Sequence, residues 1–166
     1  MSIVVRFAQE GDADDMVSIF AEAALLQRRL STLFWDANDI DHSYVRRLIA
    51  AGEAVIAHAD GEAVGIMALQ WRDLLFWPDR DDGAAGYIHR LAVRRAWAGG
   101  RVTTPLLAFA DSEARARAKS FLRLDCAPLP RLCAVYERAG FARVDIVDIS
   151  QLGADFRTAR YERALI

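Results

Sequence analysis

The sequence lacks the features that mark membrane and nucleic-acid-binding proteins. It has no apolar run long enough to span a bilayer, and its apolar start, Ile3–Val5, is followed at once by Arg6 and then by acidic residues. We therefore expect neither a signal peptide nor a membrane helix. The formal net charge is -2 and no stretch is rich in Lys or Arg, so the basic stripe that nucleic-acid binding needs is missing.

Cysteine is also scarce. The two cysteines, Cys126 and Cys133, lie in apolar segments with no histidine nearby. Their spacing is a poor pattern for metal binding, so we expect no metal site. Free cysteine is among the most buried residue types, and two buried free thiols are typical of a reducing compartment. We therefore expect a cytoplasmic protein.

What the sequence does contain is the composition of a globular domain. Hydrophobic residues make up 54% of the 166 positions and charged residues 27%, a balance typical of a folded chain. The length suits one domain with a core of its own. Because no repeat, low-complexity tract or linker interrupts it, we predict a single domain over residues 1–166.

Alternating and helical hydrophobic patterns predict about seven strands and about four helices in a mixed α/β fold. The predicted strands are residues 3–8, 53–59, 63–71, 86–93, 121–126, 141–148 and 156–165, and the predicted helices are about 12–30, 39–51, 103–119 and 130–139. Asp60-Gly61 predicts a hairpin turn, and the aperiodic residues 73–83 predict a loop. Thr104 is the expected N-cap of the third helix, with Pro105 at its first position.

Four segments resemble one known family. They are Tyr-Ile-His-Arg-Leu-Ala-Val at 87–93, Leu-Arg-Leu-Asp-Cys at 122–126, Tyr-Glu-Arg-Ala-Gly-Phe at 136–141 and Arg-Tyr-Glu-Arg-Ala-Leu at 160–165. In this order and spacing they resemble the GNAT superfamily of N-acetyltransferases. The resemblance implies a single-domain GNAT-like α+β fold, with a mixed, mostly antiparallel sheet flanked by helices.

The same resemblance implies an activity. It is the direct transfer of an acetyl group from acetyl-CoA to a primary amine in a ternary complex, with CoA as the product. The acceptor is a small molecule or a peptide; no nucleic acid or membrane is expected as a partner, and a homodimer is left open. A second hypothesis is a degenerate, non-catalytic member that binds an acyl-CoA or a protein partner. It is suggested by departures from the family's pattern at Ala98, Arg101, Thr103 and Leu129.

The resemblance also places the cofactor. A helix N-terminus offers unpaired N–H groups and a positive dipole end to a pyrophosphate, and the family's Arg/Gln-x-x-Gly-x-Gly/Ala loop precedes such a helix. Here it aligns either with Ala98, Arg101 and Thr103 or, shifted, with residues 95–100. We expect backbone N–H groups to hold the pyrophosphate, Arg101 to add charge, and the strand end to pair with the pantetheine arm. The expected cofactor-binding residues are Leu91, Ala92, Val93, Ala98, Gly99, Gly100, Arg101, Val102, Thr103 and Thr104.

The resemblance assigns catalytic candidates as well. Tyr136 matches the family's tyrosine that protonates the leaving sulfur, although a helix-face aromatic in the core would explain it equally simply. His89 or Tyr87 is the candidate base. Histidine's unperturbed pKa of about 6.5 suits this role near neutral pH, and the alternative is that both side chains merely pack. Asp125 is a weaker candidate, for which a structural hydrogen bond is the simpler interpretation.

The acceptor site is the least defined. Relatives line it with the first helix pair and the loop before the fourth strand, which here contain a leucine, aromatic residues and acids. These are Leu33, Phe34, Trp35, Trp71, Phe76, Trp77, Asp79, Asp81 and Asp82. Aromatics with acids would suit a cationic amine that has an apolar body. The simpler interpretation is a packed loop with a solvated acidic tip.

Overall fold

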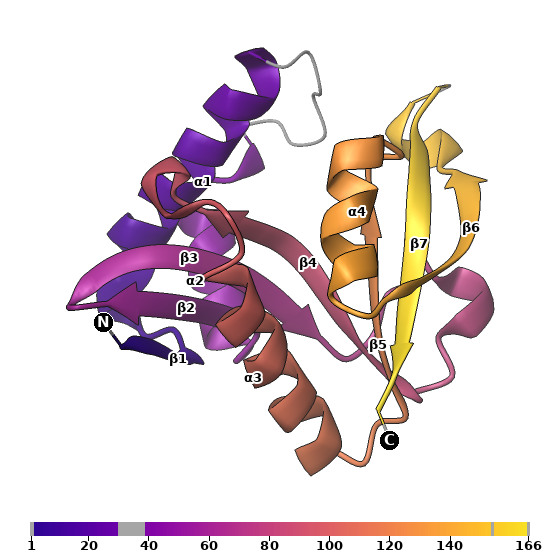
Figure 1. Ribbon diagram of the computed structural model, residues 1–166, viewed down its shortest axis with the longest axis horizontal. Helices are drawn as coiled ribbons and strands as arrows, with labels where there is room; N and C mark the ends of the chain where they lie inside the picture. The colour runs from indigo at the N-terminus through magenta and orange to yellow at the C-terminus, as the bar shows by residue number, and fades with distance from the viewer. Residues whose placement is uncertain (1, 30–38, 154, 166) are drawn as a thin grey trace. The chain divides into compact units, whose positions relative to one another are not determined.

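The computed structural model describes residues 2–29, 39–153 and 155–165 (Figure 1). The chain divides into two compact units. The first is formed by the chain up to Leu69 together with Arg90–Phe109, and the second by Gln70–His89 together with the chain from Ala110 onward. We describe each unit by itself.

The described residues form seven strands and four helices, as predicted. The strands are β1 (Ile3–Phe7), β2 (Ala54–Ala59), β3 (Glu62–Gln70), β4 (Ala85–Val93), β5 (Phe121–Cys126), β6 (Ala142–Asp148) and β7 (Arg157–Ala164). The helices are α1 (Ala13–Arg29), α2 (His42–Ala50), α3 (Thr103–Ala116) and α4 (Pro130–Arg138). The sheet order is β1-β2-β3-β4-β5-β7-β6. β4 and β5 are parallel, whereas β1–β2, β2–β3, β5–β7 and β6–β7 are antiparallel. The expected mixed, mostly antiparallel α+β fold is confirmed.

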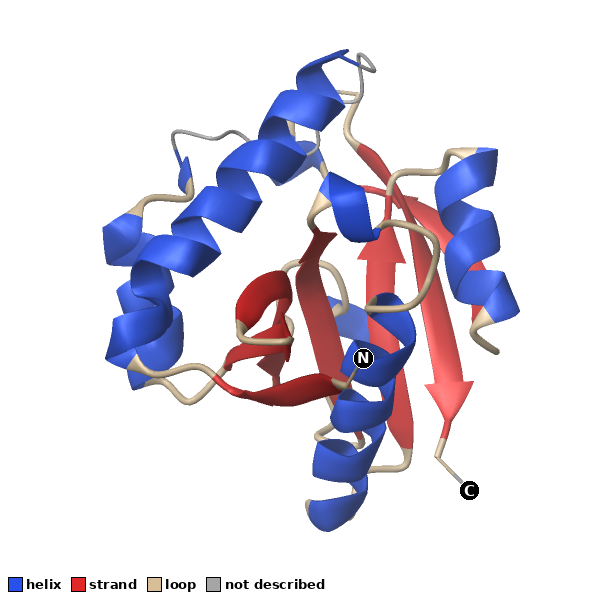
Figure 2. Ribbon diagram, turned by 60° about the vertical axis from the view of Figure 1, so that its left-hand side comes forward, coloured by secondary structure: helices blue, strands red, loops and turns tan. Residues whose placement is uncertain are grey.

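In the first unit, α1 and α2 cover one face of β1, β2 and β3 (Figures 1 and 2). The predicted apolar stripe of α1 is buried there through Met16, Ile19 and Phe20. Leu30, at the end of that stripe, lies outside the described residues. The β2–β3 hairpin turns at Asp60 and Gly61, whose φ angles are 49° and 89°. Two consecutive positive φ values are the requirement of the tight hairpin turn that this dipeptide predicted.

Helix α3 contributes residues to both units, and its start corrects one prediction. The helix begins at Thr103, so Thr104 lies inside it rather than at the N-cap, and Pro105 is its third residue. A proline is tolerated there because the first N–H groups of a helix have no partner within it. The helix ends at Ala116, before the predicted Lys119, since Ala118 adopts a positive φ of 53°.

In the second unit, two buried arginines of the sheet tie down the segment between β3 and β4. Arg123 on β5 donates to the Arg80 carbonyl at 2.6 Å and to Glu162 at 2.7 Å. Arg160 on β7 donates to Asp79 at 2.6 Å and to the Phe76 carbonyl at 3.1 Å. Both guanidinium groups lie over the ring of Trp77, a fully buried residue. Residues 73–83 are therefore a loop, as predicted, but one that is anchored at several points.

The remaining structural predictions concern cysteine and the membrane. Cys126 and Cys133 are free thiols and both are buried, as expected. Within the part of the chain that the structure describes, no helix combines the length and apolar character that crossing a bilayer requires.

Candidate active site

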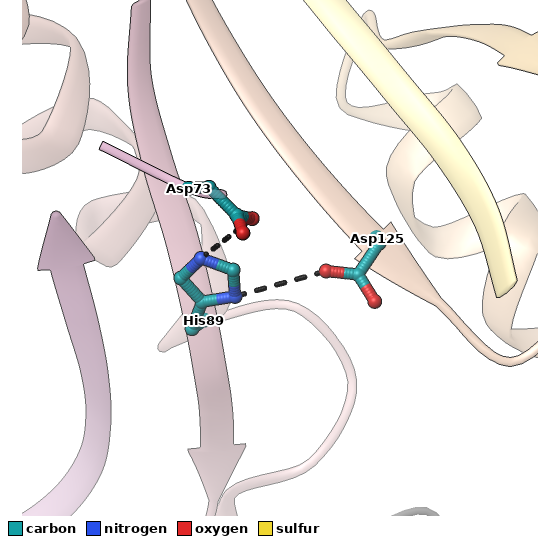
Figure 3. Close-up of side chains that lie close together, drawn as sticks. All are labelled: Asp73, His89 and Asp125. Carbon is teal, nitrogen blue, oxygen red and sulfur yellow. Dashed lines mark ion pairs between the residues drawn. The ribbon is translucent and has the colours of Figure 1, made fainter. Parts of the chain in front are cut away.

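His89 of β4 lies between two carboxylates in the second unit (Figure 3). Its Nε2 is 3.1 Å from Asp73 Oδ2, and its Nδ1 is 3.7 Å from Asp125 Oδ1. The side chains of Asp73 and Asp125 are only 4% and 5% exposed, whereas that of His89 is 15% exposed. The histidine is therefore the accessible member of the cluster, and the two carboxylates form its buried support.

Each carboxylate is held in place by contacts of its own. Asp73 Oδ1 accepts the backbone N–H groups of Leu75 at 3.1 Å and Phe76 at 2.9 Å. Asp125 Oδ2 accepts the Thr158 hydroxyl at 2.9 Å, the structural hydrogen bond that the sequence suggested. In each aspartate the other oxygen is thus the one directed at His89.

Tyr87, the alternative base, occupies a different environment. Its side chain is fully buried, its hydroxyl donates to the Arg80 carbonyl at 3.0 Å, and it accepts from Arg123 at 3.2 Å. Burial raises the pKa of Tyr87, although the hydrogen bond from Arg123 opposes the shift. A phenol that holds its proton and is already hydrogen-bonded is poorly suited to accept one. These contacts favour His89 as the base.

Tyr136 lies on α4 and is 8% exposed. Its ring contacts Phe141 edge-on and Tyr161 at a tilt, each at a centroid distance of 6.3 Å. Burial raises the pKa of Tyr136 above its ordinary value, with smaller contributions from Cys126 and Asp125. The side chain therefore packs in the core, as the simpler interpretation has it, and also keeps its proton, as an acid must.

The segment between β4 and α3, in the first unit, turns tightly before the helix begins. Gly99 and Gly100 adopt positive φ values of 107° and 94°, which glycine reaches without strain. Thr104 N–H donates to the Gly100 carbonyl at 3.0 Å. The N–H groups of Arg101, Val102 and Thr103 come before this bond, at the open end of the helical ladder. The start of α3 at Thr103 favours the alignment of the family's loop with Ala98, Arg101 and Thr103.

The side chains of this loop leave its backbone accessible. Ala98, Gly99, Gly100, Arg101 and Thr104 are exposed, Thr103 is half-buried, and Val102 alone of the expected loop residues is buried. A methyl group on either glycine would meet no atom of the described residues within 4 Å. Open N–H groups beside small residues are the features by which a helix start holds a diphosphate, so the loop fits this group.

Gly65 on β3 lets the loop approach the sheet. A methyl group at Gly65 would lie 2.5 Å from Val102 Cγ1, 3.2 Å from Leu106 Cδ1 and 3.4 Å from the Ala92 carbonyl oxygen. No side chain larger than hydrogen fits without a shift of Val102. The absence of a side chain at Gly65 therefore sets the position of the start of α3.

Glu22 of α1 fixes the other end of the loop. One of its carboxylate oxygens accepts the backbone N–H of Arg95 at 2.7 Å, and the other lies 3.1 Å from Arg94 Nη1. Arg94 also donates through Nε to the Ala63 carbonyl at 2.8 Å. The chain leaving β4 is thereby tied both to α1 and to β3.

The end of β4 contains the expected partners of the pantetheine arm. Ala92 is buried, whereas Leu91 and Val93 are half-buried. Arg90, just before them, has a φ of 54°, a strained conformation for a residue with a side chain, of the kind that clusters at functional sites. A shallow groove beside Val93 is lined within the first unit by Glu22, Ala23, Leu25, Leu26, Arg29, Val93 and Arg95.

Most of the aromatic and acidic residues expected at the acceptor site are buried or paired with other residues of the fold. Trp77 is buried between two arginines, Asp79 pairs with Arg160, and Asp81 pairs with Arg72. This favours the interpretation of a packed loop. Phe76 remains beside His89, at a ring distance of 5.9 Å. Leu33, Phe34 and Trp35 lie outside the described residues.

Comparison with known proteins identifies the family. A sequence profile of the GNAT acetyltransferase family matches residues 17–141, well over half of the chain. The chain therefore belongs to the GNAT acetyltransferase family. A search among proteins of curated function finds no similar sequence.

Solved structures agree on the fold. A GNAT-family acetyltransferase from Listeria monocytogenes is 22% identical, with 98% of this chain and 95% of that chain covered at a TM-score of 0.76. YncA from Salmonella typhimurium, solved with acetyl-CoA, is 17% identical over 100% and 95% of the two chains, with a TM-score of 0.74. The PaiA N-acetyltransferase from Thermoplasma acidophilum, solved with coenzyme A, is 14% identical over 99% of each chain, with a TM-score of 0.75.

The structure adds residues that the sequence did not single out. Asp73 and Gly65 contact the predicted site residues His89 and Val102, and Glu22 contacts Arg94 and Arg95, between the predicted strand end and loop. Each contact joins residues that lie 16 or more positions apart in the chain. Glu22 lies on the polar side of a predicted helix, and Gly65 stands inside a predicted strand. An isolated glycine within a strand indicates close backbone packing. Of these three residues, only Gly65 could therefore have been identified from the sequence.

Proposed function

We propose that the protein is an acetyl-CoA-dependent N-acetyltransferase that acts on a primary amine. The observation that carries this proposal is the open loop of Gly99 and Gly100 at the start of α3, in a chain of the GNAT acetyltransferase family. Two of the similar structures, YncA and PaiA, contain acetyl-CoA and coenzyme A, which supports the same cofactor here. The acceptor is a small molecule or a peptide.

In this proposal the residues of the first unit bind the cofactor. The N–H groups from Gly99 to Thr103 hold the pyrophosphate, and the exposed Arg101 adds a charge-assisted contact. The backbone of Leu91 and Val93 pairs with the pantetheine arm. The bound cofactor supplies an activated acetyl group as a thioester.

Residues of the second unit move the protons. A free alkyl ammonium has a pKa of about 10.4, so its nitrogen needs a base before it can attack a carbonyl. His89 takes this proton, because it is the accessible member of its cluster and has a carboxylate beside each ring nitrogen. Tyr136 donates a proton to the departing thiolate.

The binding step is tested by titration calorimetry with acetyl-CoA. We expect wild-type protein to bind, and Arg101→Glu to bind at least about tenfold more weakly because it places a negative charge at the pyrophosphate. Arg143→Glu is the matched control, since Arg143 is an exposed arginine of β6 and its substitution changes the net charge equally. Wild-type protein that shows no heat of binding to acetyl-CoA or CoA would overturn the proposal.

Turnover separates the two functional hypotheses. Thiol release is followed with n-butylamine, benzylamine and a lysine-containing dipeptide as acceptors. Release above the rate without amine supports the enzyme, and loss of that release in Tyr136→Phe supports the assigned acid. Tight acetyl-CoA binding without release on any acceptor would instead support the non-catalytic alternative.

A further inference from the structure

We infer that Asp73 and His89 bind a divalent transition-metal ion, for which Zn²⁺ is the best match, and that Asp125 orients the histidine in this site (Figure 3). All three residues belong to the second unit. The bound ion blocks the proposed base, so it inhibits acetyl transfer. Binding of the ion is independent of the proposed function, whereas its effect on turnover rests on that function. The expectation of no metal site came from the two cysteines, which this cluster does not include.

Asp73 offers a carboxylate that is held in one orientation. Its Oδ1 accepts the backbone N–H groups of Leu75 and Phe76, at 3.1 and 2.9 Å. Its Oδ2 is buried and has no hydrogen-bond partner among the described residues. A buried carboxylate oxygen without a partner is costly, so such an oxygen calls for an explanation. The loop therefore presents a fixed oxygen ligand to whatever lies beside His89.

The histidine lies close to this oxygen but is not aligned with it. His89 Nε2 is 3.1 Å from Asp73 Oδ2, yet the two atoms form no hydrogen bond. The distance alone permits one, so the oxygen lies off the axis of the ring nitrogen. Two ligands of one metal ion are arranged in this way, because the ion takes the lone-pair axis and the second ligand lies to its side. Tetrahedral ligands about 2.0–2.2 Å from Zn²⁺ are about 3.3–3.5 Å apart, close to the observed spacing.

A proton is the competing occupant of the same lone pair. A protonated His89 would pair with Asp73 as an imidazolium, and its N–H bond would then point at Oδ2. The missing hydrogen bond between the two atoms argues against this arrangement. The off-axis oxygen therefore favours a metal ion over a proton.

Asp125 lies beside the other ring nitrogen. His89 Nδ1 is 3.7 Å from Asp125 Oδ1, so the proton that Nδ1 carries when Nε2 binds a metal faces a carboxylate. Metal-binding histidines almost always direct their second N–H to such a group. Asp125 is itself held by the Thr158 hydroxyl at 2.9 Å, and a carboxylate has lone pairs for several contacts. One ligand atom from each of Asp73, His89 and Asp125 lies within 4.8 Å of the other two, so the charge of Asp125 also acts on the ion.

The ligand chemistry selects Zn²⁺ over the hard cations. Mg²⁺ and Ca²⁺ prefer oxygen ligands throughout, whereas Zn²⁺ binds imidazole nitrogen together with carboxylate oxygen. Two protein ligands leave the remaining positions to water, so the ion can exchange with the solvent. His89, whose side chain is 15% exposed, gives it a route of entry.

The bound ion has a direct consequence for the proposed base. Nε2 is then occupied by the metal and Nδ1 by its proton. An imidazole in this state has no lone pair left for the proton of the acceptor ammonium. Zn²⁺ and acetyl transfer therefore exclude one another at His89.

Binding is tested by titration calorimetry with ZnCl₂ on metal-free protein. We expect one Zn²⁺ per wild-type chain, with binding at least about a hundredfold weaker in Asp73→Asn and in His89→Gln. Asp125→Asn should weaken binding by about ten- to a hundredfold, the usual effect of losing the partner of a metal ligand. The asparagine at position 73 keeps an oxygen for the two N–H groups of the loop, and thermal unfolding checks that each variant is folded.

Two matched controls change the same residue types elsewhere. Asp148→Asn removes an exposed aspartate that pairs with Arg157. His42→Gln removes a histidine whose Nε2 is 2.7 Å from Asp14 in an exposed pair. Both variants should bind Zn²⁺ as wild type does. A wild type without Zn²⁺ binding, or equal binding in Asp73→Asn and wild type, would overturn the inference and leave the proposed function standing.

The effect on turnover is measured separately, as N-acetylbenzylamine formed from acetyl-CoA and benzylamine. Zn²⁺ near its dissociation constant should halve the initial rate, EDTA should restore it, and Mg²⁺ at the same concentration should have no effect. An unchanged rate at saturating Zn²⁺ would overturn the blocking of His89. A metal-free wild type that forms no product with any acceptor would instead count against the proposed function, and the calorimetry would still decide whether the metal site exists.

Discussion

Tyr87 and Tyr136 both have a raised pKa, but their hydroxyl groups are used differently. The Tyr87 hydroxyl is engaged by Arg80 and Arg123 and ties the anchored loop to the sheet. Tyr136 packs through its ring, against Phe141 and Tyr161. Of the two, Tyr136 is the phenol that can meet an incoming group without first breaking a hydrogen bond to the loop.

This difference predicts the kinetics of Tyr136→Phe. The substitution should lower kcat by about a hundredfold or more, as expected for removal of a general acid. Because burial raises the pKa of Tyr136, its neutral form persists to higher pH than in a free tyrosine. The wild-type kcat should therefore show no loss from tyrosine ionisation below about pH 10. Tyr161→Phe, which removes the neighbouring hydroxyl, is the control, and a kcat within twofold of wild type in Tyr136→Phe would contradict the assignment.

Single residues could be proposed as site residues where a local motif contains them. Tyr136 and His89 stand in such motifs, and the structure places His89 beside Asp125, the weaker candidate from the sequence. Asp73 could not be predicted as the partner of His89. Its loop has no periodicity, and the path of that loop depends on Arg123 and Arg160, which lie far along the chain. Side-chain contacts across such distances do not follow from local sequence.

At the scale of elements, the predicted helices and strands agreed closely with the observed ones, because turn and cap signals reinforced the hydrophobic patterns. The Asp60-Gly61 turn aligned β2 with β3, and the helix spacing of α1 gave its buried face. Helix α3 begins at Thr103, the first residue of the predicted range 103–119, but the N-cap was wrongly assigned to Thr104 from its pattern with Pro105. Val102 buries its side chain against Gly65, and this tertiary contact sets where the helix begins.

That contact predicts the effect of Gly65→Ala. The added methyl group would come within 2.5 Å of Val102 Cγ1, and a β-branched valine has little freedom to move aside. We expect destabilisation of about 1–3 kcal/mol and weaker acetyl-CoA binding, because the loop must shift. Thermal unfolding and calorimetry measure the two effects. Gly11→Ala is the control, since its methyl group would meet no atom of the described residues within 4 Å, and equal behaviour of the two variants would refute the role of Gly65.

At the scale of the whole molecule, each compact unit contains arginine–aspartate pairs in which one partner is buried, Asp12 in the first unit and Arg160 in the second. In the first unit Arg6 lowers the pKa of Asp12. In the second, Arg160 lowers the pKa of both Asp79 and Asp145. These pairs stabilise the folded protein only while the carboxylates are ionised. The stability of both units therefore depends on aspartate carboxylates being ionised.

The shared dependence predicts how the protein unfolds in acid. A carboxyl whose pKa is lower in the folded state binds protons more tightly when unfolded, so its stabilisation is complete above the usual aspartate value of 3.8 and is lost as pH falls below it. The difference in free energy of unfolding between wild type and Asp145→Asn should be largest above about pH 5 and should shrink toward pH 2. Asp12→Asn should show the same trend in the first unit, with urea unfolding at each pH as the measurement. A difference that stays constant across this range would mean that the pairs do not control acid stability. Because β4 and α3 contribute residues to both units, the two variants should lose their difference from wild type over the same pH window.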